Sequence, residues 1–305
     1  MSKRALVFPG QASQEVGMAH DIHEHHASVR ELYTVAAEIL GYDLAKLSFE
    51  GPLEALTETR VTQPAIFTAS AAYTSLLPRN YAFDMVAGHS LGEFSALYAA
   101  GALSFEDGLR IVKVRAEGMQ AAGEEQPGTM AAVLNLSRKD VDKLCNHAGK
   151  RGIIQAANFN SPGQIVISGE VDAVHYAMEV AKNMGARRAV ELKVSGAFHS
   201  PLMASARDAL AEAVTQATFK PAQVPLYANC SAKPATEPDT LRENLLAQLE
   251  SPVLWEDSIL QMIKDGANSF VEVGPGKVLQ GLIRRIDRSA ETSGIQSQAD
   301  LEELA

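Results

Sequence analysis

Ser90 lies at the centre of a Gly-x-Ser-x-Gly segment, Gly88-His89-Ser90-Leu91-Gly92, and could act as a nucleophile. Residues 84–87 are predicted to end a short buried strand, and residues 93–100 carry apolar side chains at helical spacing. On such a turn the glycines let neighbouring backbone approach closely, and the following helix directs its positive end at the reacting centre. The alternative is a glycine-rich turn whose serine only caps the helix. The flanking strand and helix favour the nucleophile.

A serine nucleophile needs a general base, and His199 is the histidine best placed to supply it. It follows Ser195-Gly196-Ala197-Phe198 in a loop from which a side chain can point into a cleft. Its position after Ser90 in the chain also matches hydrolase-type sites. No aspartate is clearly placed to orient the imidazole, because Asp172 is better explained as the first-turn acid of a helix. We therefore expect a Ser–His pair oriented by an amide or a main-chain carbonyl.

The other histidines and the cysteines do not form a metal-binding pattern. The run at residues 21–26, Asp-Ile-His-Glu-His-His, lies in a polar stretch without a recognised ligand spacing, so we interpret it as solvated surface. His147 and His175 occupy polar positions of predicted helices, and His89 is interpreted as a structural neighbour of Ser90. The two cysteines lie far apart and are typical of small core residues in a reduced compartment: Cys145 and Cys230.

The composition is that of an ordinary globular protein. The 305 residues are 46% hydrophobic and 21% charged, enough for one large domain or two unequal ones. The formal net charge of −10 argues against a general nucleic-acid binder, because phosphate binding needs a basic face. No stretch is long and apolar enough to span a bilayer, and Met1-Ser2-Lys3-Arg4 lacks the features of a signal peptide. We therefore expect a cytoplasmic protein.

The elements that would position Ser90 follow an α/β pattern. Strands are predicted at about 4–8 and 84–87, with helices at about 28–40, 64–77, 93–100 and 105–121. This alternation predicts a mostly parallel sheet covered on both faces. The pattern returns after residue 201, with a helix to residue 216, a strand near 226, helices near 241 and 255, a strand at 269–273 and a helix at 277–286.

The middle of the chain has a different order. Strands at 129–134, 153–158, 164–168 and 187–194 alternate with helices at 137–148 and 171–184 in a β-α-β-β-α-β order, the pattern of a ferredoxin-like unit. We predict a ferredoxin-like subdomain, residues 127–198, inserted into a core made of residues 1–126 and 199–305. The polar, acidic tail 289–305 is expected to be partly ordered at best.

Seven motifs, in order along almost the whole chain, resemble the malonyl-CoA:acyl-carrier-protein transacylases of fatty acid and polyketide synthesis. They are Phe8-Pro9-Gly10-Gln11-Ala12-Ser13-Gln14, Gly88-His89-Ser90-Leu91-Gly92-Glu93, Arg115, Asn158-Phe159-Asn160-Ser161-Pro162-Gly163-Gln164, Gly196-Ala197-Phe198-His199-Ser200, Gln248-Leu249-Glu250-Ser251-Pro252-Val253 and Glu272-Val273-Gly274-Pro275-Gly276. The resemblance implies an α/β-hydrolase-like core with a ferredoxin-like insertion, in agreement with the order of elements.

The resemblance also implies catalytic roles. Ser90 would attack a thioester carbonyl, and His199 would accept its proton while Gln248 orients the imidazole. The backbone N–H groups of Gln11 and Leu91 would form the oxyanion hole, where a lost donor costs about 3–4 kcal/mol of barrier.

Substrate selection is implied at further positions. Arg115 would hold the free carboxylate of a malonyl group, which its planar fork binds in a bidentate manner; without the resemblance it reads as a surface charge. Asn158 would shape the acyl pocket, or instead cap a turn. Phe198 is similar to the bulky residue of malonyl-selective members and would disfavour an α-methyl group by about 1–3 kcal/mol. Ala12 stands where many relatives have glycine and would be strained at positive φ.

The implied reaction is a ping-pong transfer in which malonyl-CoA acylates Ser90 and the phosphopantetheine thiol of an acyl carrier protein takes the malonyl group. Neither half-reaction needs a metal or other cofactor. We expect a monomer that meets the carrier protein transiently and binds no nucleic acid or membrane. The alternatives are an acyl-CoA or acyl-carrier-protein hydrolase of the same fold, a trans-acting polyketide synthase acyltransferase, and an idle scaffold. Arg115 argues against the hydrolase, since a general acyl hydrolase gains nothing from a carboxylate clamp.

Carrier proteins are usually acidic, so this acidic chain would need a local basic patch. The candidate cations are Lys182, Arg187, Arg188, Lys193, Lys277, Arg284 and Arg285. Ordinary solvated charges are the alternative for each of them.

Overall fold

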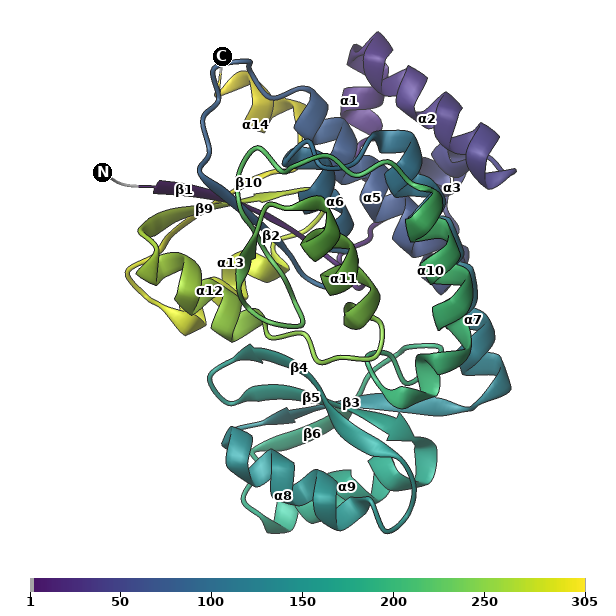
Figure 1. The fold of residues 1–305 in the computed structure, drawn as a ribbon, viewed down its shortest axis with the longest axis vertical. Coiled ribbons are helices and arrows are strands. Elements are labelled where there is room, and N and C mark those ends of the chain that lie inside the picture. The colour runs from purple at the N-terminus through teal and green to yellow at the C-terminus, as the bar shows by residue number, and fades with distance from the viewer. Residues whose placement is uncertain (1–2, 305) are drawn as a thin grey trace.

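The computed structural model describes residues 3–304, and within them the chain forms two β-sheets (Figure 1). The larger sheet has the strand order β10-β9-β1-β2-β7-β8. The strand bounds are β1 Lys3–Phe8, β2 Met85–Gly88, β7 Leu226–Tyr227, β8 Pro234–Ala235, β9 Ala267–Val273 and β10 Glu291–Ile295. Neighbours pair in parallel except β7 and β8, which are antiparallel. The mostly parallel sheet predicted from the sequence is confirmed.

The register of β1 and β2 brings two loops together. Phe8 pairs with Gly88, so the two strands end at the same level. The N–H of His89 donates to the carbonyl oxygen of Phe8 at 3.0 Å and ties the loops to each other. Because ligands of open α/β sheets bind at the carboxyl ends of the strands, this edge is the expected place for a site.

Helices cover both faces of the larger sheet (Figure 1). Alternate residues of β1 point to opposite faces, so Leu6 and Phe8 join one core cluster while Ala5 and Val7 join another. The second cluster includes Trp255, the first residue of α12. The helix bounds are α1 His20–His25, α2 Ala27–Leu40, α3 Leu44–Glu50, α4 Leu53–Thr57, α5 Thr59–Ser75, α6 Gly92–Ala99, α7 Phe105–Glu125, η1 Pro201–Ala206, α10 Arg207–Gln216, α11 Pro238–Gln248, α12 Trp255–Lys264, α13 Val278–Ile286 and α14 Gln298–Glu302.

The smaller sheet lies at one end of the molecule with two helices on its outer face (Figure 1). Its elements follow the order β3 Gly128–Leu134, α8 Arg138–Ala148, β4 Ile154–Ser161, β5 Gln164–Glu170, α9 Val171–Asn183 and β6 Arg188–Glu191. All its strands pair antiparallel, in the spatial order β4-β5-β3-β6. The strands and helices of this unit share a separate hydrophobic cluster.

The smaller unit is joined to the larger one at two places. Its entry and exit lie against each other, because a Cβ at Gly123 would collide with the carbonyl oxygen of Ser195. In addition, the backbone of Val253 exchanges hydrogen bonds with β4: its N–H donates to Ala157 at 2.8 Å, and its carbonyl accepts from Phe159 at 2.9 Å. These joints fix the loop that carries His199 relative to the larger sheet.

The expectation that the tail 289–305 is partly ordered at best is wrong over its described part, because β10 and α14 lie within it. Parallel pairing with β9 satisfies the backbone of this polar segment without needing apolar side chains. The tail is also bonded to the larger unit: the Tyr73 hydroxyl donates to the carbonyl of Gln296 at 2.5 Å, and the Gln298 N–H donates to Asp21 at 2.6 Å. Ala305, like Met1 and Ser2, lies outside the described residues.

The first sixty residues hold more helix than the sequence analysis predicted. The helices α1, α3 and α4 are five to seven residues long, too short to display a helical period. The helix predicted from residue 201 begins as the 3₁₀ helix η1 before α10. None of the helices between residues 3 and 304 has the length and apolar character needed to cross a membrane.

Candidate active site

Ser90 sits on the tight turn between β2 and α6, at a positive φ of 51°. The glycines on either side are required by space: a Cβ at Gly88 would collide with the backbone of Gly92, and one at Gly92 with the carbonyl oxygen of Phe8. The N-cap of α6 is Leu91, and it makes no side-chain cap hydrogen bond. The alternative reading of Ser90 as a helix cap is therefore wrong, and its hydroxyl is free for other partners.

His199 faces this hydroxyl. Its Nε2 lies 2.7 Å from Ser90 Oγ, and its Nδ1 lies 3.0 Å from the main-chain carbonyl oxygen of Gln248. A carbonyl can only accept, so Nδ1 carries the hydrogen and Nε2 presents its lone pair to Ser90. Burial, assisted by the charge of Arg115, lowers the pKa of His199 to about 3. The imidazole is therefore neutral at physiological pH and fit to accept a proton.

Arg115 lies on α7 with only 1% of its surface exposed, so the reading of it as a surface charge is wrong. Its Nη2 donates to Ser90 Oγ at 3.0 Å and to Gln248 Oε1 at 2.9 Å, and its Nη1 donates to Gln63 Oε1 at 2.6 Å. Burial lowers its pKa to about 10, and Glu93 opposes this shift. Its acceptors are neutral, so the cation keeps its charge for an anion beside Ser90.

Asn229, in the loop after β7, holds the turn between β2 and α6 that carries Ser90, named here the nucleophile turn. Its Oδ1 accepts from the N–H of Ser90 at 2.7 Å, and its Nδ2 donates to the carbonyl of Gly88 at 2.6 Å. Its own N–H donates to Glu93 at 2.9 Å. These bonds stabilise the strained backbone of Ser90.

A cavity of about 520 Å³ brings the predicted residues together. Its lining includes Gln11, Ser90, Leu91, Arg115, Asn158, Phe198 and His199. Asn158 lies within β4 rather than in a turn, so its alternative reading as a turn cap is wrong. Gln248 is not part of the lining but contacts it through Arg115, Ser90 and His199. Much of the remaining wall is apolar, which suits an acyl chain: Met119, Met130, Ala132, Val166 and Val194.

The two predicted oxyanion donors lie on neighbouring loops. Gln11 follows β1 and Leu91 precedes α6, and both line the cavity next to Ser90. Ala12 has a φ of 81°, the strained conformation considered for it from the sequence. Its N–H donates to the side chain of Gln14 at 2.8 Å, which helps hold this loop.

His89 is held away from the reacting atoms. Its Nε2 lies 2.8 Å from Asn160 Oδ1, and its ring packs at 5.6 Å from that of Trp255. Burial lowers its pKa. It therefore acts as a neutral support between the nucleophile turn, β4 and α12.

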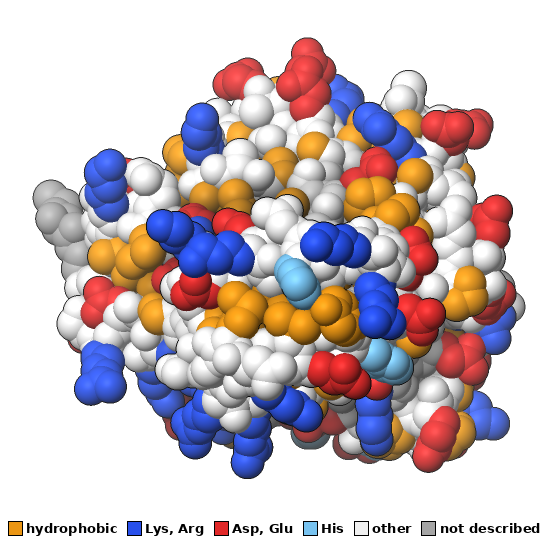
Figure 2. All heavy atoms as spheres, turned by 90° about the horizontal axis from the view of Figure 1, so that it is seen from below, with side chains coloured by type: hydrophobic (Ala, Val, Ile, Leu, Met, Phe, Trp, Pro, Cys, Tyr) orange, Lys and Arg blue, Asp and Glu red, His pale blue; other side chains and the backbone are white. Residues whose placement is uncertain are grey.

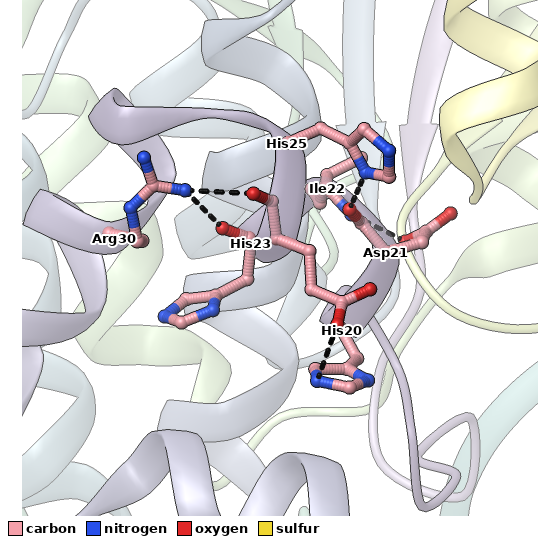
Figure 3. A network of polar contacts seen from close by, with 7 residues as sticks. His20, Asp21, Ile22, His23, His25 and Arg30 are labelled. Carbon is pink, nitrogen blue, oxygen red and sulfur yellow. Dashed lines mark hydrogen bonds and ion pairs between the residues drawn. The ribbon is translucent and has the colours of Figure 1, made fainter.

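The histidine run at residues 20–26 lies in and beside α1 (Figure 3). Its rings point in different directions: those of His20 and His23 pack on Phe49, each at 4.8 Å, while His25 Nδ1 lies 2.7 Å from the carbonyl of Asp21. Arg30, in α2, donates to the backbone carbonyls of His23 and Glu24 in α1. Among residues 3–304 no group of three or more His, Cys, Asp or Glu is arranged to hold a metal ion.

The family description "Acyl transferase domain" matches residues 5–300 of this chain. The chain is 42% identical, over 304 residues, to the malonyl CoA-acyl carrier protein transacylase of Bacillus subtilis (strain 168), covering 99% of this chain and 96% of the relative. The chain belongs to the malonyl-CoA:acyl-carrier-protein transacylase family.

Solved structures of this transacylase family have the same fold. An acyl carrier protein S-malonyltransferase from Vibrio cholerae O1 superposes with a TM-score of 0.94 at 39% identity, covering 100% of both chains. A malonyl transacylase in complex with its type II polyketide synthase acyl carrier protein superposes with a TM-score of 0.95 at 37% identity, covering 99% of both chains.

Three buried polar residues of the site were not singled out from the sequence. Asn229 lies shortly after the parallel strand β7, and ligand sites form at the carboxyl ends of such strands. This position was the only feature of the sequence that could have indicated a role for Asn229 in the site. Gln63 is an amide in the buried helix α5. Glu93 resembles an ordinary first-turn acid of α6, yet it is only 1% exposed.

Proposed function

We propose that this chain transfers a malonyl group from malonyl-CoA to the phosphopantetheine thiol of an acyl carrier protein through an ester on Ser90. The observation that carries the proposal is the buried Arg115 guanidinium, 3.0 Å from Ser90 Oγ and held by neutral acceptors. A cation at this distance can bind the free carboxylate of an acyl group attached to Ser90. A simple acyl group has no carboxylate to bind there.

In the first half-reaction, His199 Nε2 accepts the Ser90 proton while Oγ attacks the thioester carbonyl of malonyl-CoA. The oxyanion receives hydrogen bonds from the N–H groups of Gln11 and Leu91. When the tetrahedral intermediate collapses, the C–S bond breaks and His199 returns the proton to the departing CoA sulfur. The products are free CoA and malonyl-Ser90.

The second half-reaction runs in reverse with a different thiol. His199 accepts the proton of the phosphopantetheine thiol, whose sulfur attacks the ester of Ser90. Collapse breaks the C–O bond, and the proton moves from His199 to Ser90 Oγ. Protons and bonds balance in each half-reaction without a metal or redox cofactor.

Selection of the acyl group rests on the cavity walls. Arg115 binds the carboxylate and so fixes the malonyl ester against Ser90, where Phe198 crowds the space that an α-methyl group would occupy. Paired hydrogen bonds of about 2.7–2.9 Å, typical of a guanidinium–carboxylate pair, would fix both oxygens of the carboxylate. Asn158 adds a polar group to a wall that is otherwise mostly apolar.

The partner is an acyl carrier protein that meets the mouth of the cavity. Of the seven cations proposed for this contact, Lys193 lines the cavity. Val278, the first residue of α13, also lines the cavity and is 48% exposed. Figure 2 shows the end that carries α8 and α9, where Lys and Arg are interspersed with Asp and Glu. Lys193→Glu should therefore raise the carrier-protein KM more than Arg187→Glu/Arg188→Glu does, and an unchanged KM in the double variant would remove that pair from consideration.

Intact-protein mass spectrometry tests the proposal directly. The protein is mixed with malonyl-CoA, with Ser90→Ala as the control, and holo carrier protein is then added. A malonyl adduct that needs Ser90 and moves to the carrier supports the transacylase. An adduct lost to water regardless of carrier would favour an acyl hydrolase, and no adduct with CoA unreleased would contradict both.

A further inference from the structure

Glu93 is a carboxylate inside the protein, three residues after the nucleophile. It lies in the first turn of α6 and is 1% exposed. Its Oε2 accepts hydrogen bonds from the N–H of Asn229 at 2.9 Å and from Nε2 of Gln248 at 3.0 Å. A buried carboxylate is costly unless it is hydrogen-bonded, so these two donors define its place in the fold.

The hydrogen bond from Gln248 to Glu93 determines the orientation of the Gln248 side-chain amide. Gln248 Nε2 donates to Glu93 and also to the carbonyl of Ser90, both at 3.0 Å. The amide oxygen must then face the other way, where it accepts from Arg115 at 2.9 Å. The reverse orientation would bring the amide oxygen against the carboxylate and the amide N–H groups against the guanidinium. Glu93 therefore selects one of two orientations.

Arg115 depends on that orientation. Its Nη2 contacts both Gln248 Oε1 and Ser90 Oγ, so the amide oxygen helps fix the guanidinium beside the nucleophile. Glu93 forms no direct ion pair with Arg115, because the Gln248 amide lies between them. The hydrogen-bonded connection from the carboxylate to Arg115 thus runs through the amide, in addition to the direct effect of the Glu93 charge on the guanidinium.

We propose that Glu93 is a positioning residue for acyl selection: as a hydrogen-bond acceptor it fixes the Gln248 amide, which in turn fixes Arg115 to receive the malonyl carboxylate. This inference rests on the proposed function of the site. In this inference the preference for malonyl groups depends on the position of Glu93 as a hydrogen-bond acceptor, and not on its charge.

Two substitutions distinguish the length of the Glu93 side chain from its charge. Glu93→Gln keeps the length of the side chain and an oxygen that can accept both bonds, but removes the charge. Glu93→Asp keeps the charge but is one methylene too short. The readout is the ratio of single-turnover acylation rates with malonyl-CoA and acetyl-CoA, followed as CoA release and as the mass of the Ser90 adduct.

Glu93→Gln should keep the wild-type ratio or increase it. Glu93→Asp should lower the ratio by about ten- to a hundredfold, the range expected for losing a hydrogen bond to a charged group. A ratio lowered by Glu93→Gln but kept by Glu93→Asp would overturn the inference, because charge would then be the active property. Equal ratios in all three proteins would overturn it as well.

A double-mutant cycle with Gln248→Met tests the route through the amide. This change removes the amide but keeps the main-chain carbonyl that contacts His199. If Glu93 acts through the amide, Glu93→Asp should alter the ratio by less than about threefold once Gln248 is methionine. A full additional loss in the double variant would contradict the inference. Wild-type protein in the same assay separates the two levels: absence of a malonyl-Ser90 ester there contradicts the proposed function instead.

Discussion

The Nδ1 atom of His199 lies 3.0 Å from the main-chain carbonyl oxygen of Gln248, so a neutral backbone group orients this imidazole. In many serine hydrolases a carboxylate occupies this position and stabilises the imidazolium that forms during reaction. Here the buried carboxylate, Glu93, hydrogen-bonds to the side chain of Gln248 instead. His199 and Arg115 therefore depend on different parts of the same glutamine: His199 contacts its main-chain carbonyl, and Arg115 contacts its side-chain amide.

Replacing the base should abolish most of the chemistry without abolishing substrate binding. We expect His199→Ala to lower the rate of acylation by malonyl-CoA by about 10²–10⁴-fold, the usual contribution of a general base. CoA release in a single turnover measures the rate, and calorimetry measures binding. His147→Ala is the matched control, since that exposed histidine contacts Tyr176 far from the cavity. A loss of similar size in both variants would contradict the assignment of His199.

The acylation rate should not decline near the ordinary histidine pKa. Burial, with Arg115 as the second cause, lowers the pKa of His199 to about 3, so the neutral base persists as pH falls from 8 to 5. The rate at saturating malonyl-CoA should therefore stay nearly constant over this range. Stopped-flow CoA release gives the profile, and an inflection between pH 6 and 6.5 would show that His199 titrates normally.

The malonyl-CoA KM should depend on pH through Glu93. Burial raises the pKa of Glu93 to about 7, while Gln248, Asn229 and the charge of Arg115 oppose the shift. The charged or titratable groups acting with Glu93 are Arg115 and the Cys230 thiol. Above pH 7 the ionised Glu93 competes with the malonyl carboxylate for the field of Arg115, so KM should fall as pH decreases from 8 to 6. Glu93→Gln should have the low KM throughout; a KM for wild type that is flat over this range would contradict the prediction.

Removing the guanidinium should change the acyl preference. Arg115→Ala should lower kcat/KM for malonyl-CoA by about 10²-fold or more, because a charge-assisted bidentate contact is lost. The same variant should gain acetyl transfer, since the buried cation no longer opposes an apolar acyl group. Arg115→Lys should recover only part of the malonyl activity, because an ammonium group cannot bind both carboxylate oxygens in a planar fork. Malonyl transfer retained in Arg115→Ala without any acetyl gain would refute this account of selectivity.

The nucleophile turn should not tolerate a methyl group at Gly92. Gly92→Ala places a Cβ against the carbonyl oxygen of Phe8, and we expect a loss of about 3 kcal/mol or more in the free energy of unfolding. Gly281→Ala is the matched control, because it lies within α13 and its Cβ would meet nothing within 4 Å. That change should stabilise the protein by about 0.5–1 kcal/mol. Urea unfolding midpoints compare the two, and equal midpoints would contradict the argument.

Residues positioned by segments adjacent in the chain were predictable from the sequence, and residues positioned by distant segments were not. Ser90 was predicted because its strand, turn and helix are adjacent in sequence. Arg115 needed the family resemblance, because nothing near it in the chain shows that α7 buries it. Asn229 and Glu93 were not assigned roles, because their mutual contact joins segments that are far apart in the chain. The order of the tail was misjudged because it depends on pairing with β9 and on a hydrogen bond from the distant Tyr73, and the composition of the tail shows neither.

The place of β1 in the larger sheet bears on how the protein can be made. Its neighbours are β2, at residues 85–88, and β9, at residues 267–273. While the chain is on a ribosome, β1 can pair with β2 early, but its other edge stays open until residue 273 has emerged from the exit tunnel. We therefore expect the loop after β1, which carries Gln11, to become fully fixed only after β9 has paired with β1. Nascent chains stopped before β9 should be degraded readily by protease and bind chaperones, and the enzyme should acquire activity late and all at once.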